Sequence, residues 1–145
     1  MILPLLCEDL KQIASYARVD NQAYRILKSH TPGPYTFILK ATKEVPKMLM
    51  HPKKKTIGIR VPGNNIIQAI LQILGEPILT STLILPGDEY PMTDPYDIQQ
   101  TLGTSLDLII DGGYCGMDET SLISLVDDNI EVLRQGAGPV EAFLA

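Results

Sequence analysis

Apolar and polar residues alternate along residues 55–62, Lys-Thr-Ile-Gly-Ile-Arg-Val-Pro, and this alternation predicts a β-strand. Successive side chains of a strand point to opposite faces, so the two isoleucines and the valine form one apolar face for a core. Thr56, Gly58 and Arg60 share the other face, where a hydroxyl, a bare backbone and a guanidinium suit the binding of an anion. The pattern also fits, with nothing added, an ordinary edge strand whose Arg60 lies in solvent.

The rest of the chain alternates between strand and helix patterns. Short apolar runs predict further strands over residues 2–6, 35–40, 76–82, 106–111, 121–125 and 130–134. Helical spacing of apolar residues predicts helices over residues 10–17, 21–28, 46–50, 65–74 and 95–102. Prolines and a glycine predict a loop over residues 83–95, and residues 140–144 fit either a last strand or a frayed end.

The helix predicted over residues 65–74 has clear signals at both ends. Asn64 is a plausible N-cap, and Gly75 occupies the position after the last turn where glycine is favoured. Its apolar residues form one stripe, composed of Ile66, Ile70, Ile73 and Leu74. Because a predicted strand lies on either side of this helix, we expect a crossover unit.

The composition is that of an ordinary globular protein, with 145 residues of which 45% are hydrophobic and 20% charged. We therefore expect a single domain over residues 1–145, an α/β fold with a mixed sheet and flanking helices. No apolar run reaches the roughly 18 residues of a membrane helix, and the first residues lack the basic start of a signal peptide. Cys7 and Cys115 form neither a metal motif nor a disulfide framework, so we expect a reducing, cytoplasmic location.

The charges are divided unevenly along the chain. Residues 1–60 carry a net charge of +7 and residues 61–145 a net charge of −12, with His taken as neutral. A basic half favours an anionic ligand, either a nucleotide or a nucleic acid. The alternative is that the two halves interleave in the fold and their fields cancel.

Other candidate chemistry is sparse. His30 and His51 have no partner at metal-ligand spacing, so we expect no metal site, and the chain has no phosphate-cradling glycine loop or nucleophile elbow. The hydroxyl cluster at residues 80–82 follows a predicted strand, where α/β sheets usually bind ligands. Residues 53–55, three lysines in a row, fit either a contact with a nucleic-acid backbone or a solvated turn.

Five short motifs, in order along nearly the whole chain, resemble the YrdC/YciO family, and more closely its YciO-like branch. They are a Pro-Gly-Pro-x-Thr strand, an Arg-x-Pro strand, a Gly-x-Pro-Ile turn, an Asp-Gly-Gly turn and an Arg-Gln-Gly turn, at residues 32–39, 56–62, 75–78, 111–113 and 133–136. The resemblance implies a twisted, YrdC-like α/β fold with a concave, positively charged groove. Members of the YrdC branch are threonylcarbamoyl-adenylate synthases, which join threonine, bicarbonate and ATP to modify adenosine-37 of certain tRNAs.

The resemblance also implies ligands and site residues. It implies ATP with magnesium as a possible cofactor, and nucleotide or RNA, including tRNA and double-stranded RNA, as partners. By its motifs, nucleotide contacts fall to Thr56, Thr82 and Arg134. Contacts to a threonine-like substrate fall to Arg60, Thr80 and Thr120. Guanidinium groups suit carboxylate and phosphate, and hydroxyls suit the remaining oxygens.

Two departures separate this sequence from the synthases. Residues 82–84 read Thr-Leu-Ile where the synthases carry Ser-x-Asn, and their upstream Lys-x-Arg pair has no counterpart. Each lost charge-assisted contact removes roughly 1.5–3 kcal/mol of binding. The chain begins near where the upstream pair should end, so we expect an N-terminally truncated domain, with a homodimer as the alternative that fills the gap.

Three hypotheses about function follow. The first is a YciO-like domain that binds nucleotide or RNA without synthase activity. The second is an enzyme of tRNA threonylcarbamoyladenosine metabolism, either a synthase or one that acts on modified tRNA. The third is a remnant without a ligand.

Overall fold

The computed structural model describes residues 3–116 and 118–144, which gather into two compact units. Unit 1 comprises Met1–Ser81 and Glu119–Ala145, and unit 2 comprises Thr82–Asp118. The six described strands all belong to unit 1, whereas helix α4 (Pro95–Leu102) belongs to unit 2. In the sequence, unit 2 is therefore inserted between the two segments that form unit 1.

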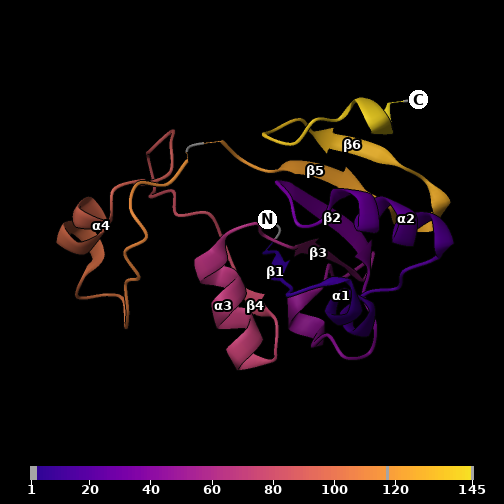
Figure 1. The fold of residues 1–145 in the computed structure, drawn as a ribbon, viewed down its shortest axis with the longest axis horizontal. Helices are drawn as coiled ribbons and strands as arrows, with labels where there is room; N and C mark the ends of the chain where they lie inside the picture. Colours follow the sequence, from indigo (N-terminus) through magenta and orange to yellow (C-terminus); the bar gives the residue numbers. More distant parts are fainter. Residues whose placement is uncertain (1–2, 117, 145) are drawn as a thin grey trace. The chain divides into compact units, whose positions relative to one another are not determined.

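Unit 1 is built on a mixed six-stranded sheet of order β4-β1-β3-β2-β5-β6 (Figure 1). Strand β3 runs parallel to β1 and antiparallel to β2, and β2 runs parallel to β5. The edge strands β4 and β6 are antiparallel to their neighbours. In chain order the strands are β1 (Leu5–Leu6), β2 (Tyr35–Lys40), β3 (Thr56–Arg60), β4 (Ile78–Leu79), β5 (Ser121–Ser124) and β6 (Glu131–Arg134). The predicted α/β fold with a mixed sheet is confirmed.

Three α-helices of unit 1 begin at side-chain caps. They are α1 (Leu10–Tyr16), α2 (Asn21–His30) and α3 (Asn65–Leu74). Asp9 accepts from the amide of Gln12 and Asp20 from that of Ala23. Asn64 accepts from the amides of the second and third residues of α3, Ile66 and Ile67. Each acceptor satisfies an amide that has no partner within the helix. Short 3-10 turns complete the elements, at Lys47–Leu49, Val126–Asp128 and Glu141–Phe143.

Strand β3 lies in the middle of the sheet, between β1 and β2. Its apolar residues Ile57 and Ile59 are buried, as predicted, but so are Thr56 and Gly58 on the opposite face. The interpretation of residues 55–62 as an edge strand with Arg60 in solvent is therefore wrong. A strand with neighbours on both sides and residues buried on both faces holds its polar side chains in fixed positions, which a solvated edge does not.

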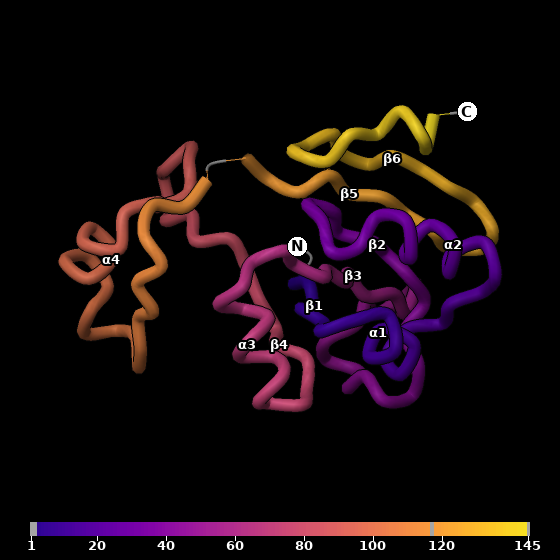
Figure 2. The backbone as a smooth tube through the Cα atoms, in the orientation of Figure 1, coloured from indigo at the N-terminus to yellow at the C-terminus, as the bar shows by residue number. Residues whose placement is uncertain are grey.

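The predicted crossover unit is not formed. Figure 2 follows the chain from β3 through α3 to β4, and β4 pairs antiparallel with β1, whereas β3 pairs parallel with β1. The strand predicted over residues 76–82 shrinks to two residues. The stripe predicted on α3 is also wrong in its burial, because the buried residue of α3 is Leu71, and Ile73 is 88% exposed.

Residues 106–111 form no strand, which corrects the prediction of a buried one. Leu106, Leu108 and Ile110 are all exposed, and the side chain of Leu108 is 75% exposed. Alternating apolar residues favour a strand only where a partner strand and a covering layer exist. Unit 2 has no strand among its described residues, so residues 106–111 have no partner strand there and no covering layer.

Residues 141–143, near the end of the described chain, form a 3-10 turn rather than a strand. The ring of Phe143 is buried and lies 6.0 Å from the Tyr35 ring and 4.8 Å from the His30 ring, measured between centroids. The Tyr35 hydroxyl also donates to the carbonyl of Pro139 over 2.8 Å. These contacts fix the segment after β6 against the start of β2. Among the described residues, no helix has the length and apolar content to cross a membrane.

Candidate functional site

The strand register brings two arginines to the same row of the sheet. Phe37 pairs with Ile59, so the next residues, Thr36 on β2 and Arg60 on β3, are neighbours. On the other side of β2, Thr36 pairs with Leu122, which pairs in turn with Arg134 of β6. Paired residues of adjacent strands point to the same face of a sheet. Arg60 and Arg134 therefore share a face, with Thr36 between them.

Arg60 is held in the protein without an acceptor for one of its donors. Its Nε atom is buried and has no hydrogen-bond partner among the described residues. Burial, followed by the positive charge of Arg134, lowers the pKa of the Arg60 guanidinium. A buried donor and an unpaired charge are costly, so both would be stabilised by an anion with acceptor oxygens.

Arg134 is fixed by the residues just before β5. Its Nε donates to the Thr120 carbonyl over 2.9 Å, and its Nη2 donates to the Thr120 hydroxyl over 3.2 Å. Glu119 Oε2 lies 3.5 Å from the same Nε, in an ion pair whose two side chains are about half exposed. A pair so exposed to water contributes little to stability. The contacts with Thr120 thus orient the guanidinium, while part of its charge faces solvent.

A hydroxyl pair links β2 to the residue that precedes β5. The Thr36 and Thr120 hydroxyl oxygens lie 2.7 Å apart, so one donates to the other. We call the four residues Arg60, Arg134, Thr36 and Thr120 the arginine–threonine cluster. It offers two guanidinium groups and two hydroxyls on one face, which is the chemistry that holds a carboxylate or a phosphate.

Gly136 closes the turn behind Arg134. Its amide donates to the Ser121 hydroxyl over 2.9 Å, and that hydroxyl donates to the carbonyl of Gly138. A Cβ at Gly136 would overlap the carbonyl oxygen of Glu119 and lie 2.6 Å from the backbone of Thr120. The glycine thus permits the close backbone approach that sets Thr120 beside Arg134.

The structure brings together three of the six site residues named from the sequence. Arg60, Arg134 and Thr120 belong to the arginine–threonine cluster. Thr56 lies on the same face of β3 as Arg60 but at the other end of the strand, about 13 Å away at the usual rise per residue. It is buried, and it pairs with Lys40.

The other two residues lie elsewhere along the chain. The hydroxyl of Thr80 donates to the carbonyl of Pro4 over 2.9 Å, next to the edge strand β4. Thr82 belongs to unit 2, where it is exposed and its carbonyl accepts from the amide of Ile84. The potential metal ligands give no cluster of three His, Cys, Asp or Glu among the described residues.

Thr36 and Ser121 are site residues that the sequence did not single out. Thr36 stands in the Pro-Gly-Pro-Tyr-Thr stretch of residues 32–36, so a signal for it was present in the motif itself. Ser121 carries no such signal. Its role is to bind the turn after β6 through Gly136 and Gly138, and these contacts are visible only in the folded chain.

Comparison with known proteins finds one matching family model and several relatives. A family model described as "Telomere recombination", for Sua5, YciO and YrdC proteins, matches residues 1–136. The protein named "Uncharacterized protein YciO" of Escherichia coli is 52% identical over 140 residues, covering 97% of this chain and 68% of that protein. A threonylcarbamoyl-AMP synthase of Idiomarina loihiensis is 31% identical over 113 residues, covering 75% of this chain and 59% of the synthase.

Solved structures agree with this relationship. The crystal structure of Escherichia coli YciO matches with a TM-score of 0.93 at 51% identity, covering 99% of this chain and 69% of that one. The crystal structure of Pyrococcus abyssi Sua5 complexed with L-threonine matches with a TM-score of 0.86 at 23% identity, covering 97% of this chain and 42% of that one. The second likeness, at this low identity, is one of fold.

Proposed function

This chain belongs to the Sua5/YciO/YrdC family, which is related to threonylcarbamoyl-AMP synthases, and we propose that it binds a nucleotide or an RNA segment without synthase activity. The single observation that carries the proposal is the unpartnered Nε of Arg60, beside a second arginine and two hydroxyls. A phosphate or carboxylate oxygen at this Nε would satisfy the donor and offset the repulsion between the two guanidinium groups.

The proposed roles extend the family's pattern to this chain. Arg60 holds a carboxylate or phosphate oxygen, Arg134 holds nucleotide phosphate, and the Thr120 hydroxyl beside Arg134 contacts a threonine-like substrate. Thr56, at the far end of β3, would contact only a ligand long enough to reach it. No role at the cluster is proposed for Thr80, whose hydroxyl is bound to the Pro4 carbonyl, or for Thr82 of unit 2. ATP with magnesium is the proposed nucleotide, and tRNA is the proposed RNA. No protein metal ligand is proposed, so magnesium would enter with the phosphates.

The proposal excludes synthase activity because of the side chain at position 84. The synthases carry an amide there, and Ile84 cannot replace its hydrogen bonds to a nucleotide or a hydrated metal. Loss of one such contact removes roughly 1.5–3 kcal/mol from binding of a charged transition state. Two free cysteines, Cys7 and Cys115, accord with a function in the reducing cytoplasm, which is the location we propose.

Calorimetric titration tests the proposal. ATP with magnesium is titrated into the chain, with and without threonine, and the experiment is repeated with Arg60→Ala and Arg134→Ala. We expect saturable binding that weakens at least tenfold in either variant, because each arginine contributes a charge-assisted contact. Arg25→Ala is the matched control, since the Arg25 guanidinium lies exposed on α2. A chain that gives no heat at millimolar ATP would contradict the nucleotide part of the proposal and leave RNA as the ligand to test.

Turnover assays test whether the chain catalyses a reaction at this site. Formation of threonylcarbamoyl-AMP from ATP, threonine and bicarbonate would contradict the proposal directly. A second candidate function, a reaction on threonylcarbamoylated tRNA, is favoured by the hydroxyl pair Thr36–Thr120, which can orient a carbamoyl or carboxyl group. Incubation with modified tRNA, followed by nucleoside analysis, tests it. An unchanged nucleoside would count against this second function.

A homodimer is the remaining part of the proposal. Exposed apolar side chains on α3, among them Ile73 and Leu74, give a second copy a surface to cover. Sedimentation analysis of the chain and of Ile73→Glu tests it. Concentration-dependent association that the glutamate removes would support the dimer, and a monomer at all concentrations would exclude it.

A further inference from the structure

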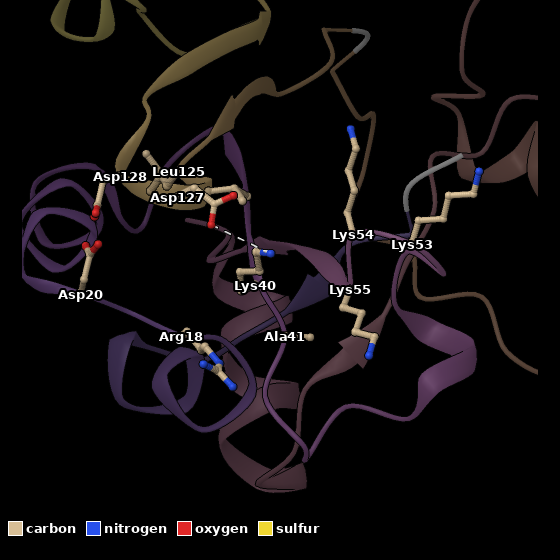
Figure 3. A pocket seen from close by; sticks show the side chains of 11 residues that line it. Arg18, Asp20, Lys40, Ala41, Lys53, Lys54, Lys55, Leu125, Asp127 and Asp128 are labelled. Atoms are coloured by element: carbon tan, nitrogen blue, oxygen red, sulfur yellow. Dashed lines mark ion pairs between the residues drawn. The ribbon is translucent and has the colours of Figure 1, made fainter.

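A second basic site lies at the opposite end of the sheet from the arginine–threonine cluster. A cavity of about 530 Å³ opens there, which we call the basic pocket (Figure 3). Lys40 is the last residue of β2, Lys55 immediately precedes β3, and Leu125 immediately follows β5, and all three line it. Because β3 runs antiparallel to β2, Arg60 lies at the far end of β3 from this pocket.

Most of the positive charge in the basic pocket is not neutralised. Its basic lining residues are Arg18, Lys40, Lys53, Lys54 and Lys55. Lys40 is 3.9 Å from Asp127, in an ion pair whose side chains are exposed. Among the described residues, no acidic group lies within ion-pair distance of the other four basic residues.

The acidic lining residues occupy the other side of the pocket. Asp20 caps α2 through the amide of Ala23, and Figure 3 shows Asp20 and Asp128 directed toward one another. Asp127 is the partner of Lys40. In the same view Lys53, Lys54 and Lys55 lie on the other side of the pocket from Asp20 and Asp128, and all three lysines are exposed.

The backbone has an unusual conformation on both sides of the basic pocket. Lys55, Asp127 and Asp128 have positive φ angles of 55°, 56° and 57°, and they are the non-glycine residues with positive φ among those described. All three line the basic pocket. Positive φ is unfavourable for residues other than glycine, and conformations of this kind cluster at binding sites.

A histidine fixes the turn that carries the lysines. The Nδ1 atom of His51 accepts from the amides of Lys53 and Lys54, over 3.2 and 3.0 Å. The His51 carbonyl accepts from the amide of Lys55 over 2.8 Å. Three consecutive amides are thus bound to one residue, which holds three exposed ammonium groups on one short turn.

The residues that line the basic pocket favour a phosphate group over a nucleotide base as its ligand. None of the described residues that line the basic pocket is aromatic, so they provide no surface on which a base could stack. Lysines are point charges on flexible stems and contact phosphate without reading a base. We propose that the basic pocket binds the phosphodiester backbone of an RNA strand, as a second contact surface that shares no residue with the arginine–threonine cluster. The proposal stands whether or not that cluster binds ATP.

Fluorescence anisotropy with a labelled 20-nucleotide oligouridylate, at several salt concentrations, tests the proposal. The test variant replaces Lys53, Lys54 and Lys55 by glutamine. The control variant makes the same change at three exposed lysines outside the pocket, Lys11, Lys43 and Lys47. Each lost phosphate contact reduces the slope of log affinity against log salt by about 0.7, so we expect the test variant to lower the slope by about 2 and affinity about tenfold or more.

The outcomes separate the alternatives. An equal loss in the control variant, or no loss in the test variant, would overturn the proposal, because the affinity would then reflect net charge alone or another surface. Thermal melting checks that both variants fold, as expected for exposed lysines. Inorganic phosphate and ATP are added as competitors at equal ionic strength. Displacement of the oligonucleotide by micromolar ATP would overturn the backbone assignment in favour of a mononucleotide site.

Discussion

Arg60 and Arg134 place two guanidinium groups on one face of the sheet, near enough that the charge of Arg134 adds to burial in lowering the pKa of Arg60. One of the two is anchored by Thr120, and the other retains a buried donor without an acceptor. Such an arrangement is destabilising without a ligand. It is the arrangement expected where two cations share one anion.

Replacement of Arg60 by methionine should separate stability from binding. Methionine fills a similar volume without a charge, so we expect the free energy of unfolding to stay level or rise by about 1 kcal/mol. Binding of ATP or RNA at the arginine–threonine cluster should be lost. Urea denaturation checks the first expectation. Arg134→Met is the matched control, and it should be less stable than the wild type because it loses both bonds to Thr120. Equal destabilisation of the two variants would show that Arg60 is an ordinary structural residue.

The hydroxyl of Thr120 should matter more than its methyl group. Thr120→Val keeps the shape but removes the bonds to Thr36 and to Arg134 Nη2, so we expect a loss of about 1–2 kcal/mol in the free energy of unfolding. Thr120→Ser keeps the hydroxyl and should lose less than half as much. Denaturation of both variants, together with ATP titration, gives the comparison. A serine variant as impaired as the valine variant would assign the effect to packing.

Gly136 should tolerate no side chain. In Gly136→Ala the new Cβ meets the backbone of Glu119 and Thr120, which cannot move as a flexible side chain can. We expect a loss of about 2–3 kcal/mol in stability, as for other overpacked sites. Gly63→Ala is the control, because no atom lies within 4 Å of a Cβ built there. Thermal melting of the two variants should differ clearly, and similar melting temperatures would contradict the close approach.

The thiol of Cys7 should make stability fall at high pH. Burial, followed by the charge of Asp9, raises the pKa of Cys7 from 9.0 to about 12. The unfolded chain therefore loses this proton at a lower pH than the folded chain does. The stability due to the neutral thiol is complete below pH 9 and is lost as pH rises toward 12, by about 1.4 kcal/mol per pH unit.

The comparison with Cys7→Val isolates this group from the other titrating residues. Wild type and variant are unfolded in urea at pH 8 and pH 10, and the wild type should lose about 1.4 kcal/mol more than the variant over that interval. Parallel pH dependences would show that the thiol ionises readily in the folded chain. Iodoacetamide at pH 8 gives a second check, since exposed Cys115 should react and buried Cys7 should not.

Local signals in the sequence predicted several elements with the bounds that the structure has. The helix at residues 65–74 begins after Asn64 and ends before Gly75, and strand β2 and helix α4 also match. Caps, terminating glycines and an N-terminal proline act within one or two turns of the chain, so a single sequence contains them.

Features that depend on distant partners were predicted less well. Residues 106–111 alternate as a strand does, yet no partner edge lies beside them in unit 2, and Leu108 stays exposed. The edge position predicted for β3 was wrong because β1, far earlier in the sequence, pairs with it. Thr36 was missed because its partner Thr120 is 84 residues away. The motifs named Arg60 and Arg134, but only the register shows that they share one row.

During synthesis from the N-terminus, the sheet of unit 1 can be completed only after unit 2 has been made, because its last two strands follow unit 2 in the sequence. Strand β2 has β3 on one side, but its other neighbour, β5, follows only after residues 82–118 have been added. Synthesis at about 5–20 residues per second makes that interval roughly 2–7 s for unit 2 alone. Throughout this interval the edge of β2 that will receive β5 is open, next to the aromatic rings of Tyr35 and Phe37. An open, apolar strand edge pairs readily with other chains. The nascent chain is therefore most prone to aggregate, and most in need of a chaperone, in the seconds before residues 121–134 emerge.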